Sequence, residues 1–517
     1  MKSKLLAYFL VLVAGGLYSL AYPSDFGEGW FPLLFLSLPF FLWKLETSIH
    51  LKESLLFILC FNAGLNLVGY YWIPHTLREF GNLPYVISVI LGLSFSLILQ
   101  PHWWLYAIWK KLRPRMKWQS ETGVMVTAFV MTMLERFTPQ QFPSYVGSPW
   151  LHLTPYLGLA PHLGVVAFSF MTFWVCLEAV TQATTKNFRP QVWVCFAVFV
   201  LLNAAMPLGK VKFERTLSVR VVQANIGNFL KVSSEKGDFN SYESIARKYQ
   251  ELSITQNGFR PELIVWPETA YSNTFSTRAS GLDQIFVDIL TSSGAEMLIG
   301  GYVQDPTKSP FEIYESIFNS SVLISDLKVK ASYHKNILIP FGETLPFGPL
   351  NNQIVSVVPA VSLFARGHGT PLMETRSGLR FITPICYEIL ESNYMRSLLN
   401  QWKDNHFIVN HTNDSWYGDT AEPYQHLFLS RWRALEFQLP IVRSTNTGIT
   451  SVIYPDGSES KRLGIGQTDI LDVKLPISPG HNTIYQLYGA FPILAIFIIL
   501  LGVTVLRERS RAAPEQA

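Results

Sequence analysis

Cysteine and charge are both scarce in this 517-residue chain. It has four cysteines, and Cys60, Cys176 and Cys195 lie inside long apolar segments, so only Cys386 stands in a polar region. A lone cysteine there has nothing to pair with, which excludes a domain held together by disulfides. Charged residues make up 15% of the chain and hydrophobic residues 49%. This balance is too apolar for an ordinary soluble protein of this length.

The sequence also lacks the short motifs of several common classes of protein. It has no internal repeat, no low-complexity stretch, and neither a Walker nor a GxGxxG phosphate motif. His406, His411 and His426 stand among Asn, Asp and Gln without zinc-ligand spacing, so we expect loop or core histidines. The net charge of +4 comes from loops beside the apolar segments. We therefore expect no metal, no other cofactor and no nucleic-acid partner.

Eight apolar segments are long enough to cross a membrane, which takes roughly 20 residues. Between about 215 and 480 no such segment occurs, and short β-branched runs alternate with polar and Gly/Pro turns. The sequence therefore predicts a membrane domain over residues 1–210 with seven transmembrane helices, a water-soluble domain over 215–480, and an eighth span before a tail at 507–517. The eight segments lie at about 4–22, 29–45, 54–74, 85–109, 121–138, 160–182, 190–208 and 487–506.

Basic residues are distributed unevenly over the loops between these segments. With the N-terminus in the cytoplasm, the short outer loops carry only Arg78 and Arg136. Because basic loops are retained in the cytoplasm, both termini are predicted inside and the 215–480 domain outside. Ser19-Leu20-Ala21 resembles a weak signal-peptide cleavage site, and cleavage there would not move the domain to the other side. The inner segments carry fourteen Lys or Arg residues, namely Lys2, Lys4, Lys44, Lys52, Lys110, Lys111, Arg113, Arg115, Lys117, Lys186, Arg189, Arg507, Arg509 and Arg511.

The 215–480 region alternates predicted strands with predicted helices. This alternation indicates an α/β layered fold. Glu268, Lys335 and Cys386 each follow the end of a predicted strand, where the active sites of α/β sheets collect. The expected strands are 217–222, 263–266, 297–301, 379–385, 407–410 and 441–443, with a hairpin at 318–323 and 329–333 turning at Ser325-Asp326, and the expected helices are 242–255 and 282–290.

Each of these three residues also has an ordinary structural interpretation. Glu268 can cap a turn, Lys335 can be a solvated loop lysine, and Cys386 can be a small buried hydrophobe. Their equivalent strand-end positions in one domain favour an active site instead. A thiol needs a base to take its proton and a cation to favour the thiolate before it attacks a carbonyl. The sequence therefore predicts a membrane-bound enzyme with Cys386 as nucleophile, Glu268 as general base and Lys335 as the cation.

The order and surroundings of these residues resemble the nitrilase, or carbon–nitrogen hydrolase, superfamily. That resemblance implies an α-β-β-α sandwich with a Glu-Lys-Cys triad. With seven spans before this domain and one after it, the chain is similar to the apolipoprotein N-acyltransferase family of bacterial inner membranes. The motifs that carry the resemblance are Trp266-Pro267-Glu268-Thr269, His334-Lys335, Pro340-Phe341-Gly342-Glu343, Ile385-Cys386-Tyr387-Glu388, Asn413-Asp414-Ser415-Trp416-Tyr417-Gly418, Arg433-Ala434-Leu435-Glu436 and Arg443-Ser444-Thr445-Asn446-Thr447-Gly448.

The resemblance implies acyl transfer in two steps at the outer face of the inner membrane. A phospholipid of the bilayer acylates Cys386 as a thioester, and the α-amine of a diacylglyceryl-modified apolipoprotein then takes the acyl chain as an amide. Glu343 matches the superfamily's second glutamate, which positions the Lys and the Cys; its ordinary interpretation is a salt-bridged loop carboxylate. Three further contacts to substrate are expected, from the Tyr387 backbone N–H as oxyanion donor and from Asn413 and Trp416 in the pocket wall. Glu388 is also expected at the substrate site, where it orients the loop rather than transferring protons.

Two stretches depart from the family pattern, and a third, separate segment suggests a lid. Lys231 is followed by Val232 where the family often has Trp, and Phe142-Pro143-Ser144-Tyr145 stands where it has Gly-Phe-Pro-Trp, with Trp150 further on. Both departures concern lipid contacts rather than the triad. Residues 341–367 form a long apolar loop bracketed by glycines, typical of a lid that enters lipid, although ordinary packing would explain it too. Its apolar residues are Ile354, Val355, Val357, Val358, Val361, Leu363 and Phe364.

Two other functions compete with acyl transfer to a lipoprotein. The first is a membrane-tethered nitrilase-type amidase, in which the same triad uses water as the acceptor. Seven spans argue against it, since one anchor would suffice for a soluble substrate. The second is a non-catalytic transporter or assembly scaffold. It predicts charges inside the spans, yet Glu135 and Glu178, near span ends, are nearly the only ones.

Overall fold

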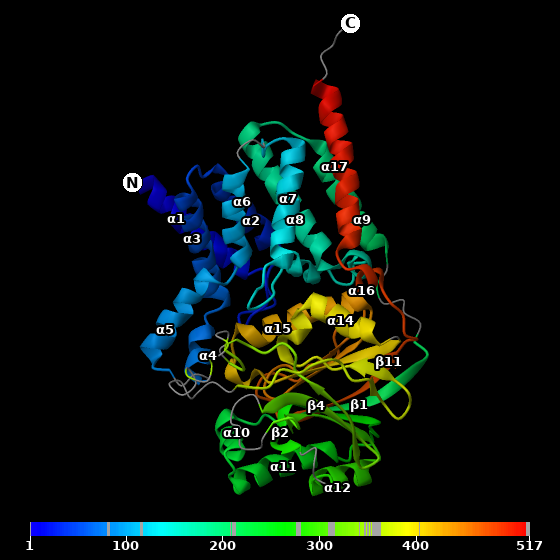
Figure 1. Cartoon of the computed structure of the whole chain (residues 1–517). Helices are drawn as coiled ribbons and strands as arrows, with labels where there is room; N and C mark the ends of the chain where they lie inside the picture. The colour runs from blue at the N-terminus through cyan, green and yellow to red at the C-terminus, as the bar shows by residue number, and fades with distance from the viewer. Residues whose placement is uncertain are drawn as a thin grey trace.

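A helical bundle lies above a two-sheet domain, and the last helix of the chain returns to the bundle (Figure 1). The computed structural model describes residues 2–79, 83–113, 117–206, 208, 213–275, 281–308, 316–340, 342–345, 348, 351, 353, 363–402 and 404–512. The long apolar runs thus form one part of the molecule, and the polar region with short strands forms the other.

Each of the eight apolar segments contains helix. Within the described residues, four helices are long and apolar enough to cross a membrane, Leu51–Gly69, Tyr85–Leu112, Ala160–Thr185 and Phe491–Ser510. Two shorter apolar helices, Lys4–Ser19 and Pro190–Ala205, accompany them. The helices of this part are α1 (Lys2–Ser19), α2 (Pro32–Thr47), α3 (Leu51–Gly69), α4 (Ile73–Glu79), α5 (Tyr85–Ser94), α6 (Pro101–Leu112), α7 (Glu121–Phe137), α8 (Ala160–Thr185), α9 (Pro190–Ala205) and α17 (Phe491–Ala512).

The segment expected at 85–109 is broken rather than continuous. α5 ends at Ser94, a 3-10 turn (η1, Phe95–Leu97) follows, and α6 begins at Pro101. Asn66 Nδ2 donates to Gly92 O at 2.8 Å, and Asn62 Nδ2 donates to Ser96 O at 3.1 Å. These two buried side chains satisfy carbonyls that the break frees, as backbone at membrane depth requires. α5 therefore leaves the bundle and lies with α4 beside the two-sheet domain (Figure 1).

The polar region is the expected α-β-β-α sandwich. One sheet has the order β11-β1-β2-β3-β4-β5 and the other β10-β9-β8-β7-β6. Figure 1 shows α11 and α12 on one side of the sheets and α14 and α15 on the other, toward the membrane helices. The strands are β1 (Arg215–Gln223), β2 (Leu263–Phe275), β3 (Glu296–Gln304), β4 (Ile317–Ser325), β5 (Lys328–His334), β6 (Met373–Glu374), β7 (Arg380–Ile382), β8 (Asn405–Thr412), β9 (Ile441–Thr445), β10 (Ser451–Ile453) and β11 (Asp469–Ile477), and the helices are α10 (Asn228–Glu235), α11 (Phe239–Ser253), α12 (Gln284–Ser293), α14 (Ser392–Gln401), α15 (Ala421–Phe437) and α16 (Ile484–Tyr488).

Two strands and the hairpin turn differ most clearly from the prediction, and the other predicted strands agree within a few residues. β2 does not stop before Glu268 but continues to Phe275, with a register break in its pairing to β3. β7 covers only Arg380–Ile382, because the chain turns at Pro384 toward a parallel bridge between Ile385 and His411. The hairpin turns at Asp326-Leu327, one residue later than expected, with φ of +51° and +57°. Positive φ at both central residues is the geometry of a type I′ turn, which suits the twist of the strands.

A buried carboxylate joins the sandwich to the membrane helices. α8 is interrupted at Gly164, with φ +65° and ψ 178°, and a Cβ there would lie 2.2 Å from the ring of Tyr485. Glu436 of α15 accepts the Val165 N–H at 3.0 Å with one oxygen, and pairs with Arg433 at 2.9 Å through the other. The interruption thus frees a backbone donor at the N-terminal end of a helical segment, where a carboxylate is favoured.

We expect Glu436→Ala to destabilise the protein by about 3–5 kcal/mol, because it leaves Arg433 and the Val165 N–H buried without their acceptor. Thermal unfolding of detergent-solubilised protein would show this as a lower Tm. The matched control is Glu243→Ala, which removes one side of the exposed Arg247–Glu243 pair and should change stability by less than about 1 kcal/mol. Equal Tm values for the two variants would contradict a joining role for Glu436.

Candidate active site

Glu268 reaches the site from the register break inside β2. The chain bulges between Trp266 and Tyr271, and Thr269 takes a φ of +50°. Gly300 on β3 permits the bulge, because a Cβ there would lie 2.1 Å from the Pro267 carbonyl oxygen. The bulge re-aims the carboxylate, as bulges beside active sites do.

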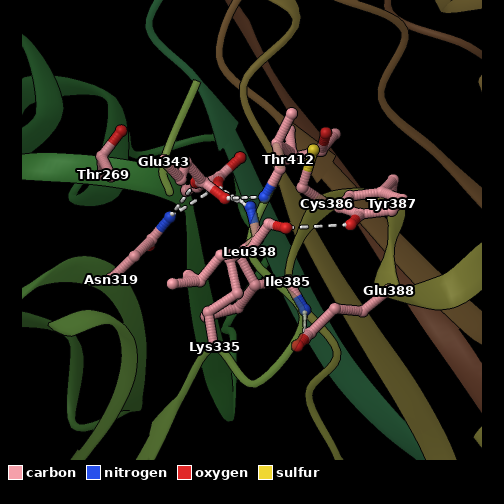
Figure 2. A network of polar contacts seen from close by, with 12 residues as sticks. Thr269, Asn319, Lys335, Leu338, Glu343, Ile385, Cys386, Tyr387, Glu388 and Thr412 are labelled. Atoms are coloured by element: carbon pink, nitrogen blue, oxygen red, sulfur yellow. Dashed lines mark hydrogen bonds and ion pairs between the residues drawn. The ribbon is translucent and has the colours of Figure 1, made fainter. Parts of the chain in front are cut away.

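Lys335 lies at the centre of a buried acidic pair. It directly follows β5, and its ammonium Nζ is 3.2 Å from Glu268 Oε1 and 2.8 Å from Glu343 Oε1. Asn319 on β4 donates to the same two oxygens, at 2.7 Å and 3.2 Å. Figure 2 shows Lys335, Glu343 and Asn319 converging, with Cys386 beside them. Burial opposes the charge of Lys335, but the two glutamates outweigh burial and raise its pKa well above its usual value. The lysine is therefore a fixed cation.

Cys386 opens a short 3-10 turn, η4 (Cys386–Leu390), and has a φ of +54°. Its side chain is buried, and it interacts electrostatically with Glu268, Lys335 and Glu343. Burial and the charge of Glu268 raise the pKa of the thiol well above its usual value, while Lys335 lowers it. The raised pKa favours the thiol form of the cysteine, and the effect of Lys335 is in the direction that the sequence predicts, toward the thiolate. The proton must leave as the sulfur attacks, which requires a base nearby.

Glu388 connects the cysteine turn with the lysine loop. Its Oε1 accepts the N–H groups of Asn336 and Ile337 at 2.7 and 2.9 Å, and its Oε2 accepts the Ile385 N–H at 2.8 Å and the Tyr333 hydroxyl at 2.7 Å. Burial raises its pKa to about 7, although the backbone donors act in the opposite direction. Both oxygens are committed to protein donors, so the structure gives Glu388 a positioning place and not one in contact with substrate.

The other expected pocket residues lie around the cysteine at different depths. The Tyr387 hydroxyl donates to Leu338 O at 3.2 Å, and its ring faces Lys335 Nζ at 6.0 Å. Asn413 Oδ1 caps the following turn, η5 (Asp414–Trp416), by accepting the Ser415 N–H. Trp416 is half-buried in that turn. Asn413 therefore shapes the wall, and Trp416 is the more exposed of the two.

Aromatic residues extend this wall toward the membrane part. The sequence motifs include Tyr417 and Phe142, but the sequence did not point to Trp72. Tyr417, after η5, interacts electrostatically with Cys386 and Glu268. Trp72 packs edge-on against Tyr417 at 5.2 Å, and Phe142 packs against Trp72 at 5.1 Å. Phe142 of the altered stretch thus lies near the site, whereas Trp150 is buried in the bundle and donates to Thr172. The site is therefore built partly from the helical domain.

Lys231, which precedes the other departure from the family pattern at Val232, is buried next to the bulge that carries Glu268. Its ammonium contacts the Thr269 hydroxyl and lies 3.9 Å from Glu235. Glu235 also accepts the Tyr302 hydroxyl at 2.6 Å. The lysine therefore steadies the bulge that carries Glu268.

One cluster has the donor types of a metal site. Asp414, Glu422 and His426 are buried, with their ligand atoms within 4.8 Å of one another. The i, i+4 spacing of Glu422 and His426 on α15 was not recognised in the sequence. Arg443 already pairs with Asp414 at 3.1 Å. Burial raises the pKa of Glu422 well above its usual value and lowers that of His426 to about 4. A neutral carboxyl and a neutral imidazole beside an Arg–Asp pair balance the charge of this cluster by themselves.

The predicted lid lies largely outside the described residues. Ile354, Val355, Val357, Val358 and Val361 are among the residues that are not described. Its described ends attach beside the triad, because Phe364 N–H donates to Glu343 O at 3.0 Å and Gly367 N–H donates to Lys335 O at 2.8 Å.

Comparison with known proteins assigns this arrangement to a family. The model of the carbon–nitrogen hydrolase family matches residues 218–483, and that of the apolipoprotein N-acyltransferase N-terminal domain matches residues 14–178. The sandwich with its Glu-Lys-Cys arrangement is thus that of a carbon–nitrogen hydrolase. An apolipoprotein N-acyltransferase of Bdellovibrio bacteriovorus is 31% identical over 93% of this chain and 91% of its own, and one of Haemophilus ducreyi is 26% identical over 98% of both.

The chain belongs to the apolipoprotein N-acyltransferase family, and it is an acyltransferase with a nitrilase-like domain and a membrane-type helical domain. Among solved structures, an amidase from Nesterenkonia sp. aligns with 56% of this chain and 98% of its own, at 16% identity and a TM-score of 0.35. That score is too low to carry an argument.

Proposed function

We propose that this protein transfers an acyl chain from a phospholipid, through a thioester on Cys386, to the N-terminal amine of a diacylglyceryl-modified apolipoprotein. The observation that carries the proposal is the buried Lys335, held between Glu268 and Glu343 beside the lone cysteine of the polar domain. Family membership supports the lipoprotein acceptor, since the relatives are named for it.

The first step acylates the cysteine. Glu268 takes the thiol proton while Sγ attacks the ester carbonyl, and the ester oxygen becomes an oxyanion held by Lys335 and the Tyr387 N–H. When the tetrahedral intermediate collapses, the carbon–oxygen bond breaks and Glu268 returns the proton to the departing alcohol. A lysophospholipid leaves, and the acyl chain remains as a thioester. Glu343 and Asn319 hold Lys335 and Glu268 in place throughout.

The second step moves the acyl chain to nitrogen. The neutral α-amine attacks the thioester, Glu268 takes a proton from it, and the carbon–sulfur bond breaks with the proton returning to Cys386. Water would waste the thioester, so the site must exclude it. The burial of Cys386 and the aromatic wall of Trp72, Tyr417 and Phe142 support such exclusion.

We further propose that the protein resides in the inner membrane with both termini in the cytoplasm and residues 215–480 on the periplasmic side. The excess of basic residues in the inner loops supports this orientation. α14 and α15 lie between the sheets and the bundle (Figure 1), and the cysteine turn η4 directly precedes α14, which supports access of lipid esters to Cys386.

The experiment that tests this function supplies the purified protein with phospholipid, with and without a diacylated lipopeptide. Without acceptor, the acyl-enzyme should accumulate after one turnover; with acceptor, the lipopeptide should gain one acyl chain per lysophospholipid released. An amidase-type enzyme that uses water would instead release free fatty acid continuously, whether or not the lipopeptide is present. Continuous release of fatty acid would therefore favour the competing function.

Lys335→Met should shift the alkylation of Cys386 to higher pH. The cation lowers the pKa of the thiol, so its removal leaves burial and the glutamates unopposed and the pKa rises further. At a fixed pH, reaction with a small alkylating reagent should then be slower than in the unmodified protein. Lys328→Met, on the exposed start of the same strand, is the control and should leave the curve in place. An unmoved curve for Lys335→Met would place the ammonium outside reach of the sulfur.

A further inference from the structure

The backbone of the nucleophile has an unfavourable conformation, and the side chain of Asn410 bonds to its carbonyl. Cys386 has a φ of +54°, a region that side chains with a Cβ rarely adopt, and such strain persists only where the surroundings enforce it. Asn410 of β8 is fully buried, and its Nδ2 donates to Cys386 O at 3.0 Å and to Pro384 O at 3.1 Å. One amide thus bonds to the carbonyls of the residues on both sides of Ile385.

A buried arginine bonds to that amide and also to Asp414, at the start of the wall that Tyr417 continues. Arg443 of β9 is fully buried, and its Nη1 donates to Asn410 Oδ1 at 3.0 Å. Because a guanidinium only donates, this contact assigns the amide nitrogen to the cysteine turn. Nη2 donates to Asp414 Oδ2 at 3.1 Å, and Asp414 begins the η5 turn that leads to Tyr417.

The carboxylate of Asp414 is tightly packed against its neighbours. A Cβ at Gly448 would lie 2.0 Å from Asp414 Oδ2, so the carboxylate occupies the space that any larger residue would need. Thr412 Oγ1 donates to the other oxygen at 3.1 Å. The carboxylate, and with it the start of η5, is therefore fixed against β8 and β9.

We infer that Arg443 is a positioning residue that sets the Cys386 turn, through Asn410, at a fixed distance from the Asp414–Tyr417 wall, against which the acyl group is bound. This inference rests on the proposed acylation of Cys386. Lysine cannot replace arginine here. The planar guanidinium donates to Asn410 and Asp414 from two separate nitrogens, and the single ammonium nitrogen of lysine cannot reproduce that geometry. The Arg443→Lys variant keeps a positive charge beside Asp414 and loses the two-donor geometry. It therefore tests the geometry of the contact separately from its charge.

The test compares Asn410→Ala, Arg443→Lys and the double variant. Formation of acyl-Cys386 from phospholipid is measured per titratable thiol, so that loss of folded protein does not count. Each single variant should acylate about 10- to 100-fold more slowly, as misplaced reacting groups do, with an unchanged KM for phospholipid. The alkylation–pH curve of Cys386 should stay in place, because the triad charges are untouched. The double variant should be no slower than the slower single, because both residues act through one chain of contacts.

A matched control separates positioning from general stability. Arg220 of β1 is equally buried and pairs with Asp472 at 2.7 Å in the other sheet. Arg220→Lys should lower Tm yet keep the rate per thiol. Wild-type rates per thiol in the Asn410 and Arg443 variants, or losses that multiply in the double variant, would overturn the inference. If Arg443→Lys does not fold, the rate per thiol of Asn410→Ala decides alone. If the unmodified protein never carries acyl on Cys386, the proposed function fails first and is recognised as such.

Discussion

Cys386→Ser should fold and insert like the unmodified protein and lose acyl transfer by on the order of a thousandfold or more. The change replaces sulfur with a smaller oxygen at a buried position, so packing is nearly preserved. A serine hydroxyl is far harder to ionise than a thiol, and a carboxylate such as Glu268 is too weak a base to ionise it. The nucleophile would therefore remain protonated.

Release of lysophospholipid by purified variants would measure this effect. Cys176→Ser is the matched control, because that cysteine is equally buried but lies in α8, within the membrane helices. It should transfer acyl chains at the normal rate. Comparable turnover by the two serine variants would mean that Cys386 does not carry the acyl group.

Glu268→Gln should stop both acylation and discharge while the site keeps its shape. The amide oxygen of glutamine can still accept from Lys335 and Asn319, as Glu268 Oε1 does now. It cannot take a proton from the thiol or from the acceptor amine. A positioned general base contributes about 10²- to 10⁴-fold, so both half-reactions should slow by that amount.

Single-turnover measurements would separate the two half-reactions of the Glu268 variant. Acylation is followed with phospholipid alone, and discharge is followed by adding lipopeptide to protein acylated beforehand with an activated ester. Glu262→Gln, one residue before β2, is the control; its carboxylate accepts the Ser218 N–H at 2.8 Å far from the cysteine. A variant that acylates slowly but discharges normally would assign the second proton transfer to another group.

Much of the fold was predictable because its signals are local. Long apolar segments mark the helical part, and short β-branched runs mark β1, β3, β8 and β9 within a few residues. The triad was predictable for a related reason. Glu268, Lys335 and Cys386 stand in short motifs at predicted strand ends, and the structure brings the three together, although Glu268 lies in the bulge inside β2.

What the sequence could not predict depends on contacts distant along the chain. β2 continues past Glu268 only because Gly300 of β3 leaves room for the bulge. Asn319 belongs to the site through β4. The sequence around it gave no sign of this role beyond a polar residue within a predicted strand. The sequence suggested that Glu388 orients the loop, but not that its partners would be backbone N–H groups of the distant lysine loop. Burial raises the pKa of the Cys386 thiol, and the distant contacts that bury this side chain leave no local pattern in the sequence.

The measurement that tests the central claim most directly is the mass of the peptide containing Cys386 after the purified protein is incubated with a phospholipid of defined chains and no acceptor. The account predicts an added mass of one acyl chain, located on Cys386 by fragmentation, removed by hydroxylamine and lost when a diacylated lipopeptide is added. An acyl chain found on another residue, or lipopeptide acylation that proceeds while Cys386 stays unmodified throughout, would contradict it.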